Sequence, residues 1–244
     1  MGEETDNFEV LHGEILDELV AFTGEKRADI RAKMEESIYR TARLFDARPD
    51  TPERFYEETD AYIYELACYE KDSWRNGLAE MLGKAMGDRH VLEYGCGIGS
   101  FALMLVKAGL RVSACDISRV NLGFLQHRIE GRGWADRIEV ARPDAALRPA
   151  EHYDVIACQH VLEHVDDPVG LLRQFHRSLV PGGLFTGIAP FDLIGPLFSE
   201  HLPENAHLRL EDLCTEAGFQ VRNTLPFGNV YGVDVVSVQA TKIG

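Results

Sequence analysis

The sequence lacks any apolar run long enough to cross a membrane, and its first residues carry no positive charge. A membrane-spanning helix needs about 20 consecutive apolar residues, and no stretch of the 244 residues meets that requirement. Residues 1–6 read MGEETD, an acidic segment, whereas a secretory signal peptide begins with basic residues. We therefore expect a cytoplasmic protein with no membrane partner.

Basic residues are also scarce, and the cysteines form no pair of the C-x-x-C type. Lysine and arginine number 25 against 40 aspartates and glutamates, a net charge of −15. Such a surface repels phosphate backbones, so we expect no nucleic-acid partner. An odd number of cysteines in separate segments is typical of reduced thiols in the cytoplasm. They are Cys68, Cys96, Cys115, Cys158 and Cys214.

Residues 1–86 show helical periodicity and no strand pattern. Apolar side chains recur every three or four residues from Phe8 to Phe22 and from Ile30 to Phe45, which predicts two amphipathic helices. Further helices are expected over residues 52–70 and 73–86. We interpret residues 1–86 as a helical domain that either covers a substrate pocket or supports a homodimer.

Aromatic residues lie on more than one face of the helix expected over residues 52–70. A tyrosine can bury its ring and keep its hydroxyl in water, so ordinary packing accounts for this pattern. Aromatic helices next to a cofactor domain also form substrate lids. On that second interpretation, Tyr56, Tyr62 and Tyr69 are candidate acceptor contacts.

From residue 89 onward, strands alternate with helices. This alternation predicts a parallel sheet covered by helices on both faces, that is, a doubly wound Rossmann-like α/β fold over residues 87–244. Two final strands follow each other with no helix between them, so we expect an antiparallel hairpin that completes a seven-stranded sheet. The expected strands are residues 90–94, 111–115, 137–141, 153–158, 184–189, 219–224 and 231–240.

A glycine-rich turn after the first of these strands is the clearest functional signal. Residues 91–100 read VLEYGCGIGS, so Gly95, Gly97 and Gly99 permit a tight turn between a strand and a helix. Such a turn brings backbone N–H groups close to a ligand. Asp116 ends the second strand 21 residues after Gly95, where an acid can accept hydrogen bonds from ribose hydroxyls.

Two other classes of protein share parts of this pattern. A nicotinamide-dependent oxidoreductase, using NAD or NADP, would carry the turn as G-x-G-x-x-G, but position 100 is serine and the glycines follow G-x-G-x-G. That class also does not predict the final hairpin. A non-catalytic nucleoside-binding module would keep Asp116 and the glycines without turnover, and it stays open as an alternative.

Taken together, these segments resemble the class I S-adenosylmethionine-dependent methyltransferase family, in its small-molecule branch. The resemblance covers residues 88–244 and implies methyl transfer to oxygen or nitrogen of a small-molecule acceptor, with S-adenosylhomocysteine as product. It leaves the N-terminal helices without a counterpart. The matching segments are Glu93 to Gly99, Asp116, Asp144 after the third strand, Tyr153 to His164, and Leu179 to Leu184.

The resemblance also implies which residues hold the donor. The glycine turn and Glu93 would take its methionine part, with Gln159 facing the same part, while Asp116 would take the ribose. Ile117 would lie against the adenine. Asp144 would meet the adenine amino group, with Ala145 beside it, although a turn role after Pro143 is the alternative for Asp144. The implied residues are Glu93, Tyr94, Gly95, Cys96, Gly97, Gly99, Asp116, Ile117, Asp144, Ala145 and Gln159.

Three histidines are candidates for a catalytic base. His160 and His164 follow the fourth strand at the mouth of the expected cleft, and His207 comes after the fifth strand. A histidine titrates in the range suited to deprotonating a hydroxyl acceptor. The alternative is that these histidines only orient the loop.

The same segment could instead bind a divalent metal. Ubiquinone-pathway O-methyltransferases and small-RNA terminal 2′-O-methyltransferases, which this segment resembles, carry Glu-x-x-Glu-His here and bind a metal with it. In this chain His160, Glu163 and His164 keep two of the three ligands. Because unliganded histidines are commoner than metal sites, we expect no metal, and chelation tests that expectation.

Overall fold

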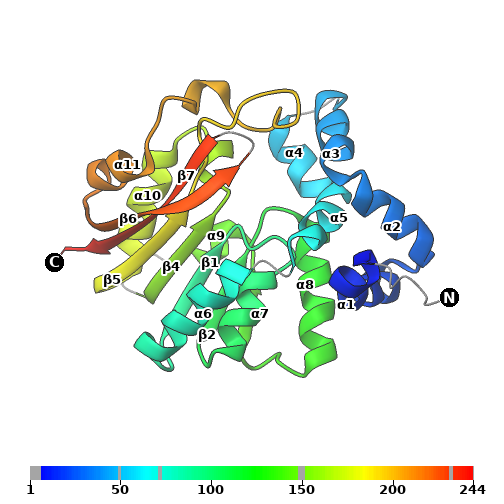
Figure 1. Ribbon diagram of the computed structural model, residues 1–244. Helices are drawn as coiled ribbons and strands as arrows, with labels where there is room; N and C mark the ends of the chain where they lie inside the picture. Colours follow the sequence, from blue (N-terminus) through cyan, green and yellow to red (C-terminus); the bar gives the residue numbers. More distant parts are fainter. Residues whose placement is uncertain (1–6, 49–50, 71–72, 148–151, 231–232, 244) are drawn as a thin grey trace.

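The computed structural model describes residues 7–48, 51–70, 73–147, 152–230 and 233–243. A seven-stranded sheet with the order β3-β2-β1-β4-β5-β7-β6 runs through it (Figure 1). Strands β1 to β5 are parallel, and β7 is antiparallel to both of its neighbours. The predicted doubly wound sheet and final hairpin are confirmed. The strands are β1 (His90–Tyr94), β2 (Arg111–Cys115), β3 (Ile138–Ala141), β4 (Tyr153–Gln159), β5 (Leu179–Ile188), β6 (Phe219–Val230) and β7 (Val233–Lys242).

Five of the helices, α1 to α5, gather on one side of the molecule and form the predicted helical extension (Figure 1). Among the described residues, none of the helices combines the length and the apolar character of a membrane span. The helices are α1 (Asn7–Thr23), α2 (Arg27–Glu35), α3 (Ser37–Asp46), α4 (Pro52–Glu58), α5 (Ala61–Cys68), α6 (Ser73–Met86), α7 (Ser100–Lys107), α8 (Arg119–Arg132), α9 (Pro143–Ala146), α10 (Pro168–Ser178) and α11 (Leu210–Glu216).

Two expected helices are broken in the structure. The stripe between residues 30 and 45 is divided into α2 and α3 at Glu36, whose ψ of 4° leaves the helical range. The helix expected over residues 52–70 is divided at Thr59, which is extended and whose hydroxyl accepts a hydrogen bond from the N–H of Ala61. Threonine side chains compete with the helix for backbone donors. The first six residues of the predicted helical domain and the start of the strand expected at Tyr231 lie outside the described residues.

Three apolar clusters stabilise the fold. One contains Phe175 and Leu213, from α10 and α11, and covers one face of the sheet. The second contains Phe101, from α7, and also takes in Leu82 of α6. The third joins the N-terminal helices to Ile98 of the glycine turn and to α8. The division of the chain at residue 86 stays a prediction, and α6 packs against the sheet domain.

One buried cation connects the N-terminal helices with the glycine turn. Arg128 of α8 is 2% exposed, and its Nε donates to Glu18 Oε2 of α1 at 2.8 Å. Its Nη2 donates to Glu70. Its Nη1 donates to the carbonyl of Ile98 at 2.9 Å and to Ser100 Oγ at 3.4 Å. Two carboxylates and a carbonyl thus satisfy a guanidinium that would otherwise be costly to bury.

Candidate functional site

A cavity of about 790 Å³ opens beside the turns that follow β1 and β4, the two strands at which the order of the sheet reverses. In doubly wound sheets, this reversal separates the loops at the carboxyl ends of two neighbouring strands and leaves a crevice there. Side chains of α4, α5 and β6 complete the walls. The volume lies within the range of about 300–1,000 Å³ that small-molecule sites occupy.

The turn after β1 depends on glycine for both conformation and space. Gly95 and Gly97 have φ angles of 74° and 53°, which strain any residue with a Cβ. A Cβ at Gly95 would lie 2.1 Å from Val161 Cγ2, and one at Gly97 would lie 2.6 Å from Leu66 Cδ1. Both glycines line the cavity, so the turn presents bare backbone to a ligand.

Asp116 holds this turn in place from the end of β2. Its Oδ2 accepts a hydrogen bond from the N–H of Gly97 at 2.8 Å, and its Oδ1 accepts one from the N–H of Ser118 at 2.7 Å. Burial raises the pKa of Asp116, and the hydrogen bonds from Ser118 and Gly97 oppose that rise. One carboxylate therefore fixes two turns and still lines the cavity.

Glu93 is a buried acid that lines the cavity beside the glycine turn. It is 6% exposed, and its Oε2 has no hydrogen-bond partner. Burial raises the pKa of Glu93 to about 8, although the charge of Arg75 opposes the rise. An unpaired buried oxygen is costly, and the ammonium group of the predicted donor would satisfy it. This part of the site therefore fits S-adenosylmethionine.

Most of the predicted donor-binding residues line the cavity, and three do not. Gly99 packs behind the turn, where an added Cβ would lie 2.2 Å from Leu125 Cδ1. Asp144 and Ala145 are exposed on α9, so their contact with the donor stays a prediction. Those that line the cavity are Glu93, Tyr94, Gly95, Cys96, Gly97, Asp116, Ile117 and Gln159.

The segment after β4 begins with a strained histidine. Among the described residues other than glycine, His160 alone has a positive φ, of 55°. Its N–H donates to the carbonyl of Ile188 at 2.9 Å. Backbone strain of this kind concentrates at functional sites. His160 lines the cavity, and its Nδ1 lies 3.5 Å from Glu163 Oε1.

Glu163 is a carboxylate buried among histidines. It is 1% exposed, and neither side-chain oxygen has a hydrogen-bond partner of normal geometry. Burial alone would raise its pKa, but the approach of His160 and the neighbouring imidazoles of His164 and His201 lower it below the ordinary value. The side chain is therefore a buried anion that faces imidazoles.

His164 is held in one tautomer by its neighbours. Its Nδ1 lies 3.0 Å from the carbonyl oxygen of Glu200 and 3.1 Å from the hydroxyl of Tyr56. The Tyr56 hydroxyl donates to the same carbonyl at 3.2 Å. Because a carbonyl can only accept, Nδ1 carries the proton, and Nε2 is left as the basic nitrogen. His164 also lines the cavity.

The residues that could bind a metal ion differ from His160, Glu163 and His164, the set that the sequence suggests. Glu163, His164 and His201 each offer one ligand atom, and these atoms lie within 4.8 Å of one another. Burial lowers the pKa of His201 to about 4, which leaves it neutral, as a ligand must be. One carboxylate and two imidazoles fit a transition metal better than magnesium. His160 is not part of this trio.

Further residues line the cavity that the sequence patterns did not predict. Glu65 and Glu200 line the cavity, and burial raises the pKa of both carboxyl groups, that of Glu200 to about 7. Glu200 and His201 lie on the segment between β5 and α11, which has no apolar period to place it. His207, a predicted base, is exposed and lies outside the cavity lining. Tyr56, Tyr62 and Tyr69 line it as expected.

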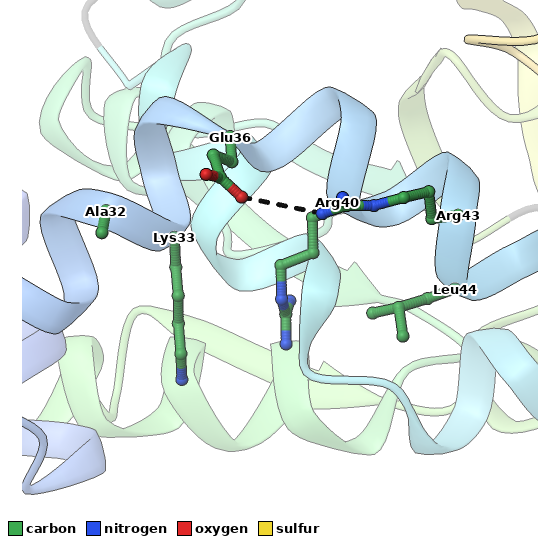
Figure 2. Close-up of a pocket in the computed structure, with 6 residues that line it drawn as sticks. All are labelled: Ala32, Lys33, Glu36, Arg40, Arg43 and Leu44. Atoms are coloured by element: carbon green, nitrogen blue, oxygen red, sulfur yellow. Dashed lines mark ion pairs between the residues drawn. The ribbon is translucent and has the colours of Figure 1, made fainter.

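A smaller depression, of about 400 Å³, lies between α2 and α3 (Figure 2). Its cationic side chains already have carboxylate partners. Lys33 Nζ lies 2.5 Å from Glu25 Oε2. Arg43 Nη2 lies 3.6 Å from Glu36 Oε2, the pair marked in Figure 2. We assign no function to it.

Comparison with known proteins gives matches to methyltransferases. A family model described as a methyltransferase domain matches residues 66–224. The ubiquinone biosynthesis O-methyltransferase of Pseudomonas syringae pv. tomato is 31% identical over 112 residues, which are 46% of this chain and 46% of that protein. The chain spans about half the length of the curated relatives that it matches.

Solved structures share the fold at low sequence identity. The 1,6-didemethyltoxoflavin-N1-methyltransferase of Burkholderia thailandensis, solved with 1,6-didemethyltoxoflavin and S-adenosylhomocysteine, is 20% identical with a TM-score of 0.58, over 75% of this chain and 84% of that one. The cyclase SpnF is 16% identical with a TM-score of 0.57, over 69% and 81%. Because the same fold carries a cyclase, the reaction has to be argued from the site.

Proposed function

The chain belongs to the methyltransferase domain family that uses S-adenosylmethionine, and from this we propose that it transfers the donor's methyl group to a hydroxyl group of a small aromatic molecule. The aromatic side chains of the cavity support an aromatic acceptor. The name of the curated relatives supports oxygen as the acceptor atom. None of these matches supports a nicotinamide-dependent oxidoreductase.

The observation that carries the proposal is the fixed tautomer of His164. The sulfonium of the donor supplies an activated methyl group, so the protein mainly has to align the acceptor and remove its proton. Nε2 of His164 is the base we propose, and the Glu200 carbonyl and Tyr56 orient the ring. The donor would be held by Glu93, Gly95, Gly97 and Asp116.

Methyl transfer to simple phenols tests this proposal. The protein is incubated with S-adenosylmethionine labelled in its methyl group and with a panel of small phenols and matched anilines. We expect labelled methyl ethers and one equivalent of S-adenosylhomocysteine. Label found only on nitrogen would contradict the choice of oxygen, and donor binding without any transfer would favour the non-catalytic module.

Donor binding is expected to depend on pH through Glu93. The pKa of about 8 in the free protein means that Glu93 is mostly protonated at neutral pH, whereas an ammonium ligand favours the carboxylate. Affinity for S-adenosylhomocysteine should therefore rise with pH, by up to about tenfold per unit below pH 8. Isothermal titration between about pH 6 and pH 8 measures this slope. In Glu93→Gln the slope should vanish, and an unchanged slope would exclude Glu93 as its source.

A second candidate mechanism is metal-assisted deprotonation, which the unpaired oxygens of Glu163 favour. Under the base mechanism we expect full activity after exhaustive chelation. The metal mechanism instead predicts a loss that a divalent transition metal restores. Glu163→Gln and His201→Gln would then abolish that recovery, and His160→Gln, outside the trio, would retain it. Metal-dependent recovery with this pattern would overturn the base mechanism.

Two further features are part of the proposal. Five unpaired cysteines, four of them buried, support a cytoplasmic location. The helical extension contributes Tyr56, Tyr62 and Tyr69 to the cavity, which supports a role as a cover over the acceptor. A homodimer through the same helices is the alternative.

A further inference from the structure

Two carboxylates of the cavity, the buried Glu200 and the half-buried Glu65, have no basic side chain among the groups that act most strongly on them. Glu200 is 7% exposed, and one oxygen of Glu65 and one of Glu200 are buried without a hydrogen-bond partner. The charges that act most strongly on Glu200 are those of Glu65, Glu163 and Asp46, all negative. Burying unpaired carboxylates costs free energy unless a ligand supplies the partner.

The positive charge of the described cavity lining lies at the other end of the site, while Arg48, outside the lining, acts on Tyr56. Among the described residues that line the cavity, the carboxylates number eight and Arg75 is the single arginine or lysine. Arg75 acts on Glu93, the residue that we assign to the donor. It is not among the groups that most strongly affect Glu65 or Glu200. The acceptor end of the cavity therefore offers carboxyl groups and no basic side chain of the lining to neutralise them.

Aromatic rings accompany these two carboxylates. Tyr56 and Tyr62 stack with their centroids 5.7 Å apart. Burial is the main cause that raises the pKa of Tyr62, and the nearby charges of Glu200 and Glu65 add to the rise. Tyrosine faces attract cations, and carboxylates form strong hydrogen bonds with ammonium groups. Rings and acids in one place are a recognition site for an organic cation.

We propose that the acceptor carries a protonated amine, which binds to Glu65 and Glu200 against the rings of Tyr56 and Tyr62. This inference rests on the proposed methyl transfer, because it takes the bound amine to be the molecule that receives the methyl group. Binding of the amine can nevertheless be measured without turnover. The amine is a recognition group, and the methyl group still goes to the hydroxyl. An acceptor with a carboxylate or phosphate at this position is excluded by like-charge repulsion.

Three phenols that differ in one charge test the proposal. Tyramine carries an ammonium group, 4-ethylphenol is neutral, and 4-hydroxyphenylacetate carries a carboxylate. Their binding to the protein saturated with S-adenosylhomocysteine is measured by isothermal titration. We expect tyramine to bind about tenfold or more tightly than 4-ethylphenol, as one charge-assisted hydrogen bond implies, and 4-hydroxyphenylacetate to bind weakest.

Isosteric variants locate the effect. Glu65→Gln and Glu200→Gln should each weaken tyramine binding by about tenfold and leave 4-ethylphenol unchanged. Glu58→Gln removes an exposed carboxylate of α4 outside the lining, and should change neither. If one variant also loses affinity for 4-ethylphenol, circular dichroism and melting temperature show whether it has lost its fold. Tyramine binding by the other, folded variant then tests the amine site.

The outcomes separate this inference from the proposed function. Equal affinity for the three phenols, no binding of tyramine at millimolar concentration, or tyramine binding that survives both variants overturns the amine site. A variant that weakens S-adenosylmethionine but not tyramine also overturns it, because the carboxylates would then serve the sulfonium. Tight tyramine binding without methylation keeps the amine site and contradicts the proposed methyl transfer.

Discussion

Replacing His164 with glutamine is expected to lower kcat by about 10²–10⁴-fold, the usual contribution of a positioned general base. Glutamine keeps a side chain of similar length but has no basic nitrogen. Binding of S-adenosylhomocysteine should change little, because the residues that we assign to the donor lie on other segments. Steady-state kinetics with the best phenol, together with titration of the product, separates the two effects.

His207→Gln is the matched control. His207 is also a candidate base in the sequence, but it is exposed and outside the cavity lining, so kcat should stay within about twofold of the wild type. Tyr56→Phe should give a smaller loss than His164→Gln, because the Glu200 carbonyl still orients the ring. If His164→Gln retains full kcat, the base lies elsewhere and the proposed mechanism is wrong.

Replacing Asp116 with alanine should weaken S-adenosylhomocysteine binding by ~1–3 kcal/mol, from lost hydrogen bonds to a charged group. The structure adds a second reason for the loss. The carboxylate already accepts from the N–H groups of Gly97 and Ser118, so its removal also releases the glycine turn that forms the other side of the donor site. Isothermal titration measures the change in affinity.

Two variants distinguish these contributions. Asp116→Asn keeps one acceptor oxygen and should recover part of the affinity, since one of the two backbone bonds can still form. Asp144→Ala removes an exposed carboxylate that the family resemblance places at the adenine, and we expect a smaller loss than for Asp116→Ala. Wild-type affinity in Asp116→Ala would rule out the assigned role of Asp116.

The sheet was predictable because its signals are local. Val91 and Leu92 are fully buried in β1, and the glycines after them have positive φ angles, so composition and conformation agree at each step. The break at Thr59 was not predictable from periodicity, since it depends on a hydroxyl that captures one backbone N–H.

The side of the cavity that we assign to the donor was predictable for the same reason, whereas the side that we assign to the acceptor was not. Gly95, Gly97 and Asp116 lie at strand ends, where a doubly wound fold always places its crevice. Glu200 and His201 belong to a segment without periodicity, and tertiary contacts alone bring them to His164, 36 residues earlier along the chain. Glu65 looks like any polar position of an amphipathic helix. Sequence patterns therefore identified the donor and left the acceptor open.

The guanidinium of Arg128 has a consequence for how the molecule unfolds. A helical extension fused to a sheet domain can melt as a separate unit when few interactions cross the boundary. Here the side chain that holds Ile98 and Ser100 also holds Glu18 and Glu70. Detaching the helices would break both ion pairs of Arg128 and expose the apolar cluster that joins these helices to Ile98 and α8. The two parts should therefore unfold in one cooperative transition, and a donor bound at the turn should raise the melting temperature of both.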